Sequence, residues 1–175
     1  GKPVPIVLPH FADIFGNGRL FDVIPSPVII SLFMLLISWF LFYHTKFGFY
    51  IRSIGGNPEA SRVAGINISF IKISAYTLSA VYAFVSGLIL AALFNSGLPD
   101  AGRDLALDSI SGVILGGTAI SGGVGSIWGT LGGCLIIASL NNGMSLLGAQ
   151  YHVQILVKGL VIILAVLMDN AMKPK

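Results

Sequence analysis

Charged side chains are scarce in this chain. Only 10% of its 175 residues are Asp, Glu, Lys or Arg, whereas 55% are hydrophobic. Soluble domains carry about 25% charged residues. Charge is missing altogether from residues 23–45, 73–99 and 109–157. A soluble domain of this size would lack the polar surface to cover so many apolar side chains. Together with a mean hydropathy of +0.89, this scarcity predicts a protein embedded in a lipid bilayer.

Cysteine and the usual catalytic patterns are also nearly or wholly missing. The one cysteine, Cys134, excludes an internal disulfide and, inside an apolar run, is expected to be a small buried hydrophobe. No phosphate-binding Gly-x-x-x-x-Gly-Lys-Ser/Thr loop, no Gly-x-Ser-x-Gly nucleophile elbow and no paired Cys or His ligands occur. The histidines are scattered, at His10, His44 and His152. We therefore expect no catalytic residue, no metal site, no cofactor and no enzymatic activity in this chain.

The cations lie where a membrane protein needs them, so the net charge of +3 does not indicate nucleic-acid binding. Positive charge is in excess over residues 44–72, and negative charge is in excess over residues 95–108. By the positive-inside rule, the first loop is expected to be cytoplasmic and the second external. The proline-rich residues 1–26 are expected to form another external loop. The charged residues are Lys46, Arg52, Glu59, Arg62 and Lys72 in the first loop, and Asp100, Arg103, Asp104 and Asp108 in the second.

A short polar island inside the first loop carries the signals of a helix. Asn57 can cap a helix, Pro58 suits its first position, and Glu59 lies where the helix dipole favours an anion. Arg62 lies near the other end, and Gly65 can end the helix in a left-handed turn. These signals predict a helix of about two turns outside the membrane. We expect such a helix to serve as a docking element for another protein.

Apolar runs predict the membrane segments. The run over residues 73–94 is long enough to cross a bilayer, which takes about 20 helical residues. The runs over 28–43 and 153–168 are somewhat shorter, and those over 110–120 and 127–140 are too short to cross comfortably alone. We expect an all-α membrane protein, a polytopic helical bundle of about four to five membrane segments. Charge counts do not decide whether the two shortest segments cross or re-enter.

Glycines recur at four-residue spacing in and between the two shortest segments, at Gly112, Gly116, Gly125, Gly129 and Gly133. This spacing lets helices approach closely, and short glycine-interrupted segments also point to a transport pathway. The two interpretations are compatible. Small polar residues nearby are candidates for contact with a neutral substrate, although helix capping and interhelical hydrogen bonds explain them equally well. They are Ser111, Thr118, Ser121, Asn141 and Asn142.

Lys158 is the one ionisable residue well inside an apolar run. A charge at membrane depth is costly, which makes this side chain a further candidate for the translocation pathway. Near the outer end of the last segment, the lysine could instead snorkel to the interface or pair with another side chain. The sequence leaves these interpretations open.

Several motifs, in order along almost the whole chain, resemble those of bacterial ABC-transporter permeases for monosaccharides, the ribose, xylose and galactose class. The strongest is Ile-Arg-Ser-Ile-Gly-Gly-Asn-Pro-Glu-Ala-Ser-Arg-Val-Ala-Gly-Ile over residues 51–66, which resembles the cytoplasmic coupling segment of these permeases. The others are Ile-Pro-Ser-Pro at 24–27, the glycine-rich stretches at 113–118 and 122–126, the stretches at 129–133 and 140–143, and the final segment at 157–169.

The resemblance implies a single transmembrane permease domain over residues 1–175, the C-terminal half of a multi-pass permease of the bacterial plasma (inner) membrane. It implies cytoplasmic ATP-binding subunits that hydrolyse ATP, an extracytoplasmic sugar-binding protein and a second permease copy or homologue as partners. We expect no nucleic-acid partner. Residues 44–72 would be the cytoplasmic coupling loop. The coupling residues would be Arg52, Gly55, Gly56, Asn57, Pro58, Glu59, Ala60, Ser61, Arg62 and Gly65.

The mechanism that we infer from this resemblance is mechanical. The short helix over residues 58–64 would sit in a cleft on an ATP-binding subunit and move as a rigid body. The spans that flank it, 28–43 and 73–94, would tilt and open the central cavity to alternate sides of the membrane. The alternative is that residues 58–64 form a solvated surface turn that contacts no partner.

Two other functions stay open. A branched-chain amino-acid permease of the same superfamily would carry a zwitterion, and the near absence of intramembrane charge weakly disfavours it. The second is a passive channel or a structural membrane subunit, for which no ATP-dependent uptake is expected.

Overall fold

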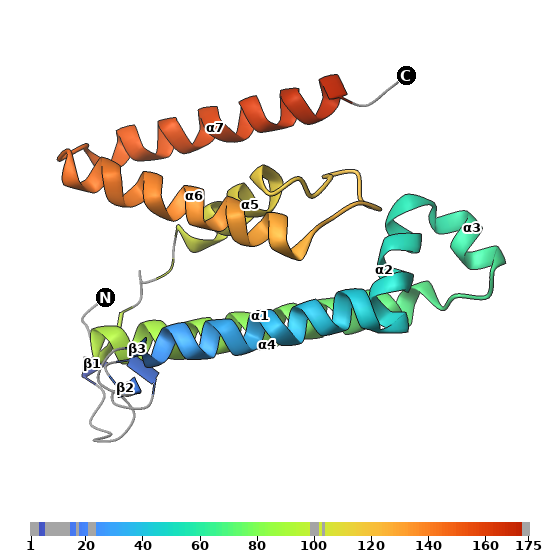
Figure 1. Cartoon of the computed structure of the whole chain (residues 1–175), viewed down its shortest axis with the longest axis horizontal. Helices are drawn as coiled ribbons and strands as arrows, with labels where there is room; N and C mark the ends of the chain where they lie inside the picture. Colours follow the sequence, from blue (N-terminus) through green and yellow to red (C-terminus); the bar gives the residue numbers. More distant parts are fainter. Residues whose placement is uncertain are drawn as a thin grey trace. The chain divides into compact units, whose positions relative to one another are not determined.

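The structure is a computed structural model, and it confirms the all-α fold expected from the sequence. It describes residues 4–5, 15–16, 18–20, 24–98, 102 and 104–172. The chain divides into two compact units, each of which is discontinuous in sequence (elements labelled in Figure 1). The first comprises Gly1–Phe49 and Asn67–Arg103, and the second comprises Tyr50–Ile66 and Asp104–Lys175.

Two long apolar helices make up most of the first unit. They are α1 (Ser26–His44) and α4 (Ile68–Phe94), with 19 and 27 residues. Among the described residues, these are the helices long and apolar enough to cross a membrane. The expected spans over 28–43 and 73–94 are therefore confirmed as helices. α4 begins earlier than expected because the Asn67 side chain caps it, accepting a hydrogen bond from the Phe70 amide at 3.1 Å.

A hydrogen-bonded cluster links α1 to α4. The Tyr82 hydroxyl on α4 donates to the Met34 carbonyl on α1 at 3.1 Å and lies 2.8 Å from the Ser38 hydroxyl, which donates to it. Polar contacts between helices replace lost contacts with water inside a bilayer and contribute roughly 0.6 kcal/mol each. This cluster therefore fixes one point of the register between the two apolar helices.

The strands are short. β1 (Val4–Pro5) pairs antiparallel with β4 (Ser96–Gly97), and β2 (Arg19–Leu20) pairs antiparallel with β3 (Ile24–Pro25). Much of the external loop expected over residues 1–26 lies outside the described residues, and the side of the membrane on which it lies stays a prediction.

The polar island is a capped helix, as its sequence predicted. α3 (Pro58–Val63) has Asn57 as its N-cap, and the Asn57 side chain accepts a hydrogen bond from the Ala60 amide at 3.0 Å. Gly65 follows with a φ of +82°, a left-handed conformation that glycine adopts without strain. The helix ends at Val63, one residue earlier than the expected end at residue 64.

The rest of residues 44–72 is largely helical too, a feature that the apolar runs did not predict. α2 (Lys46–Gly56) follows α1 almost directly. Apolar residues recur along it at helical spacing, and Ile54 is buried, so one face of the segment can pack while the other stays polar. Hydropathy alone does not reveal such a face, because Lys46 and Arg52 interrupt the apolar run.

The second unit contains three further helices, α5 (Leu105–Leu115), α6 (Ile127–Leu146) and α7 (Tyr151–Met172). α5 begins before the apolar run expected over 110–120, because an acidic first turn is stabilised by the helix dipole. It ends at a glycine pair, where Gly117 has a φ of +81°. α6 continues past the expected end at residue 140. With 11 residues, α5 is only about 16 Å long, too short to cross a bilayer alone.

α5 and α6 form a hairpin that is packed backbone to backbone through glycines. A Cβ atom on Gly116 would lie 2.5 Å from the Gly129 carbonyl carbon, and one on Gly133 would lie 2.1 Å from the Gly112 carbonyl oxygen. The close-packing interpretation of these glycines is therefore confirmed. We call these four residues the glycine clasp. Beside it, Cys134 is exposed, so its expected burial was wrong.

Replacement of Gly133 by alanine should destabilise the hairpin, because the added methyl group overlaps the Gly112 carbonyl. We expect the free energy of unfolding to fall by about 1–3 kcal/mol, although alanine is the better helix former. The measurement is the thermal unfolding midpoint of the purified permease in detergent. Gly132→Ala is the matched control, since its Cβ would meet no atom within 4 Å. Equal stability of the two variants would contradict the packing.

Candidate functional site

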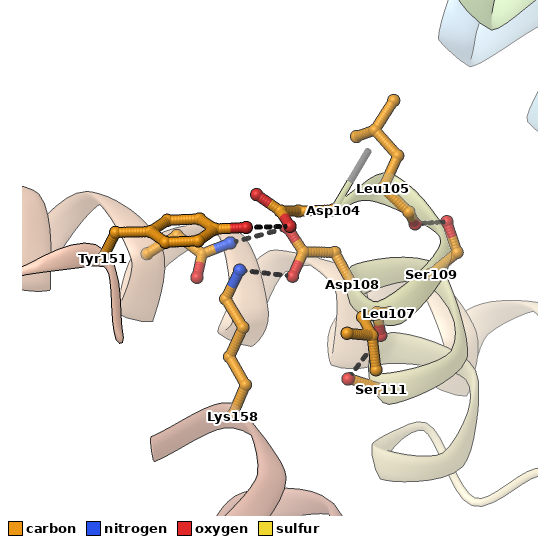
Figure 2. Close-up of polar contacts among 9 residues, drawn as sticks. Asp104, Leu105, Leu107, Asp108, Ser109, Ser111, Tyr151 and Lys158 are labelled. Carbon is orange, nitrogen blue, oxygen red and sulfur yellow. Dashed lines mark hydrogen bonds and ion pairs between the residues drawn. The ribbon is translucent and has the colours of Figure 1, made fainter. Parts of the chain in front are cut away.

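A polar cluster within the second unit joins the start of α5 to α6 and α7 (Figure 2). We call it the polar cluster; its members are Asp104, Asp108, Asn141, Tyr151 and Lys158. The aspartates lie at the N-cap position and in the first turn of α5, where the positive end of the helix dipole favours a carboxylate. Asn141 lies on α6, and the tyrosine and lysine lie on α7.

The centre of the cluster is an ion pair. Lys158 Nζ lies 2.6 Å from Asp108 Oδ1, and the Asn141 amide nitrogen donates to Asp108 Oδ2 at 2.9 Å. Lys158 is only 8% exposed. Both carboxylate oxygens are thus engaged, one by a lysine from α7 and the other by an amide from α6. Asp108 on α5 therefore links this helix to both α6 and α7.

Burial explains why these groups pair. A lone charge in an apolar environment is strongly unfavourable, whereas a paired and hydrogen-bonded charge is tolerated. The contact between Lys158 Nζ and Asp108 Oδ1 is electrostatic, without the alignment of a hydrogen bond. The Asn141 side-chain oxygen is buried and has no hydrogen-bond partner among the described residues. The ion pair thus neutralises Asp108 and Lys158, while the buried Asn141 acceptor stays unused.

A second link lies at the more exposed edge of the cluster. The Tyr151 hydroxyl donates to Asp104 Oδ1 at 2.6 Å, and Figure 2 shows the tyrosine ring directed toward that carboxylate. Hydrogen bonds to a charged acceptor are stronger than those between neutral groups. The first residue of α7 is therefore held to the residue that precedes α5.

The structure selects among the roles considered for Lys158. Snorkelling to the interface is wrong for this side chain, because it is buried and its ammonium group is paired with Asp108. Asp104, Asp108 and Tyr151 were not predicted as site residues, because acidic residues at the end of an apolar segment are typical of loops. The sequence did carry a signal for this pair. A lone lysine in an apolar segment requires an acidic partner, and Asp108 borders the apolar segment over residues 110–120.

The other pathway candidates lie in different environments. Ser111 is only 1% exposed, and its hydroxyl donates to the Leu107 carbonyl of its own helix. Thr118 is half-buried just after α5, whereas Ser121 and Asn142 are exposed. The structure brings Asn141 and Lys158 together through Asp108 and leaves these four elsewhere. Contact of any of them with a substrate stays a prediction.

The predicted coupling residues are mostly on the surface of the second unit, and their coupling role stays a prediction. Asn57, Pro58, Glu59, Ala60, Arg62 and Gly65 are exposed, and Val63 is 89% exposed. Ser61 is buried, and its hydroxyl donates to the Asn57 carbonyl at 2.9 Å, which stiffens the first turn. Arg52 and Gly55 are half-buried on α2. α3 therefore presents both charges and an apolar side chain to its surroundings.

No group of three His, Cys, Asp or Glu side chains among the described residues is placed to hold a metal ion. The contacts that the structure does show here pair charges and pack backbones, and such contacts position helices.

Replacement of Lys158 by methionine should destabilise the second unit, because Asp108 keeps its charge and loses its counter-ion. We expect a loss of about 3 kcal/mol in the free energy of unfolding, the lower end of the range for buried pairs, since the Asp108 side chain is 22% exposed. The double variant Lys158→Met/Asp108→Asn should be less destabilised than the single one. Unfolding of the purified permease in detergent measures both.

Lys72→Met provides the control, because Lys72 is exposed near the start of α4. A single variant no less stable than this control, or a double variant that is less stable than the single one, would show that the ion pair does not hold the helices.

Comparisons with known proteins identify relatives. Residues 4–166 match the family described as "Branched-chain amino acid transport system / permease component". The chain is 45% identical to the ribose import permease protein RbsC of Escherichia coli (strain K12) over 173 residues, 97% of this chain and 54% of the relative. It is 44% identical to RbsC of Bacillus subtilis (strain 168) over 158 residues, 90% and 49% of the two chains.

The chain is also 41% identical to the xylose transport system permease protein XylH of Escherichia coli (strain K12) over 150 residues, 86% of this chain and 38% of the relative. No solved structure matches. The chain spans about half the length of the ribose permeases that it matches. The resemblance found in the sequence is confirmed: this chain belongs to the branched-chain amino acid transport system permease family, and the relatives described here are sugar permeases.

Proposed function

We propose that this chain is part of the permease subunit of a bacterial ATP-binding cassette importer, and that it helps to form the gated path of a monosaccharide such as ribose, xylose or galactose. The membrane is the bacterial inner membrane, which the permease crosses several times. Separate ATP-binding subunits hydrolyse ATP, and an extracytoplasmic protein delivers the sugar. A second permease copy or a homologue completes the path. The observation that carries this proposal is the exposed, capped helix α3, in a chain that is 45% identical to a ribose import permease.

The geometry of α3 suits docking on a motor subunit. Its N-terminus is closed by the Asn57 cap and its first turn by the buried Ser61, so the helix can move as one piece. Glu59 and Arg62 are exposed and offer charged contacts, while the 89% exposed Val63 offers an apolar one. A ligand shifts a conformational equilibrium only by binding the two states differently. A docked α3 supplies such a difference when the nucleotide subunits close.

The charges of the second unit suit a neutral substrate. Because the buried Lys158 is neutralised by Asp108, the remaining pathway candidates offer hydroxyl and amide groups, which bind sugar hydroxyls. A branched-chain amino acid carries a carboxylate and an ammonium group, and would be better served by unpaired opposite charges. The family description names amino-acid transport, but the relatives described above are ribose and xylose permeases. We therefore favour a monosaccharide.

Uptake by the reconstituted transporter tests the proposed substrate. The complete permease, its ATP-binding subunits and its binding protein would be placed in proteoliposomes and supplied with labelled ribose, xylose, galactose or leucine. We expect uptake of at least one sugar that requires ATP, with no uptake of leucine. Uptake of leucine alone would support the amino-acid alternative, and sugar flux without ATP would support a passive channel.

Removal of the α3 charges tests the proposed coupling. The double variant Glu59→Gln/Arg62→Gln should lower both sugar-stimulated ATP hydrolysis and uptake about tenfold, which corresponds to about 1.4 kcal/mol of lost contact energy. Lys72→Gln removes an exposed cation outside α3 and should have no effect. Normal uptake and ATP hydrolysis in the double variant would overturn the docking role of α3.

A further inference from the structure

The end of α2 touches the turn between α5 and α6, and the contact is made by backbones. A Cβ atom on Gly55 would lie 2.4 Å from the Gly123 amide nitrogen, and a Cβ atom on Gly122 would lie 2.9 Å from the Gly55 carbonyl oxygen. Both segments belong to the second unit. In Figure 1 the turn that follows α5 reaches the end of α2. We call the packing of Gly55 against Gly122 and Gly123 the glycine contact.

The turn on one side of this contact has a defined shape. Gly122 and Gly123 have φ angles of +89° and +80°, which other residues adopt only with strain. The Ala119 amide donates to the Val124 carbonyl at 3.1 Å, and the Gly122 amide donates to the Ala119 carbonyl at 3.0 Å. Ala119 itself is buried. A displacement of this rigid turn therefore moves α5 and α6, the helices that it joins, rather than deforming the turn.

The segment on the other side is joined closely to α3. The Asn57 amide donates to the Ser53 carbonyl of α2 at 3.0 Å, and the Asn57 carbonyl accepts from the Ser61 amide of α3 at 3.1 Å. Asn57 thus belongs to the hydrogen-bonding pattern of both helices. A rotation imposed on α3 moves the end of α2, which includes Gly55.

The far side of the turn leads into the glycine clasp. Because α5 and α6 meet there at backbone distance, the hairpin shifts as one body when its turn is displaced. Asp108 at the other end of α5 is bonded to α6 and α7. Backbone contacts at glycine, hydrogen bonds and an ion pair therefore connect α3 to the polar cluster without a break.

We propose that the glycine contact transmits the movement of α3 to the α5–α6 hairpin, and that Gly55 is a positioning residue for transport. This inference rests on the proposed function. It differs from the mechanism inferred from the sequence, in which the flanking helices α1 and α4 carry the motion. The compact unit that contains residues 50–66 also contains α5, α6 and α7, whereas α1 and α4 belong to the other unit.

The test replaces Gly55 by alanine in the complete transporter. The new methyl group overlaps the Gly123 amide, so the contact must open or distort. We expect sugar uptake per ATP hydrolysed to fall about fivefold or more, within the range by which single residues alter coupling between sites. Gly122→Ala alters the same contact from the other side and should have the same effect. The ATP-binding subunits should still co-purify with both variants.

Gly132→Ala is the control, since this helical glycine on α6 has open space around its Cβ position. Nitroxide labels at Ser145→Cys on α6 and Ser69→Cys on α4, both exposed positions, report nucleotide-driven movement in a background without other cysteines. In the parent, ATP should change the spectrum of the α6 label. With Gly55→Ala, this response should be lost, while any response of the α4 label stays.

The outcomes separate the two proposals. An α6 response that persists with Gly55→Ala, loss of both responses, or loss of the ATP-binding subunits from the variant would overturn the role of the glycine contact. A parent transporter that neither binds ATP-binding subunits nor responds to ATP at either label would instead overturn the proposed function.

Discussion

The close approach of backbones at glycine is the constraint on which the second unit depends. Where α5 crosses α6, even a methyl group would overlap main-chain atoms of the other helix. Lipid is as apolar as the side chains, so there is little hydrophobic drive for helices to associate within it. Van der Waals contact at short range must do this instead, and only small residues allow it. The glycine clasp therefore sets the separation at which the polar groups of the three helices meet.

The polar cluster is the second consequence of that packing. Asp108 engages a lysine from α7 and an amide from α6, which is possible because the hairpin brings α5 and α6 within hydrogen-bonding reach. In water such a pair contributes little, whereas at a buried position the loss of one partner leaves an uncompensated charge. The cluster thus serves chiefly to hold α7 against the hairpin. Within it, neither Lys158 nor Asp108 is left as an unpaired charge.

Some features of the structure were accessible from local patterns and others were not. The α3 helix was predicted from its caps, and α1 and α4 from the length of their apolar runs, because each of these signals acts over a few neighbouring residues. α2 was missed, because Lys46 and Arg52 interrupt its hydropathy and conceal an apolar face. The segment ends around α5 and α6 were misplaced, because hydropathy does not record that an aspartate or asparagine can be turned toward a partner on another helix.

The amino-acid sequence by itself determined that the chain is a helical membrane protein with a short polar helix between two apolar ones, and its motifs determined the family. Composition, run length and capping residues act locally, so they need no knowledge of neighbours in space. The tertiary structure alone decided that Lys158 pairs with Asp108 and that Gly55 packs on Gly122. These partners are far apart in the chain, and a lysine or a glycine carries no mark of which distant residue will lie beside it.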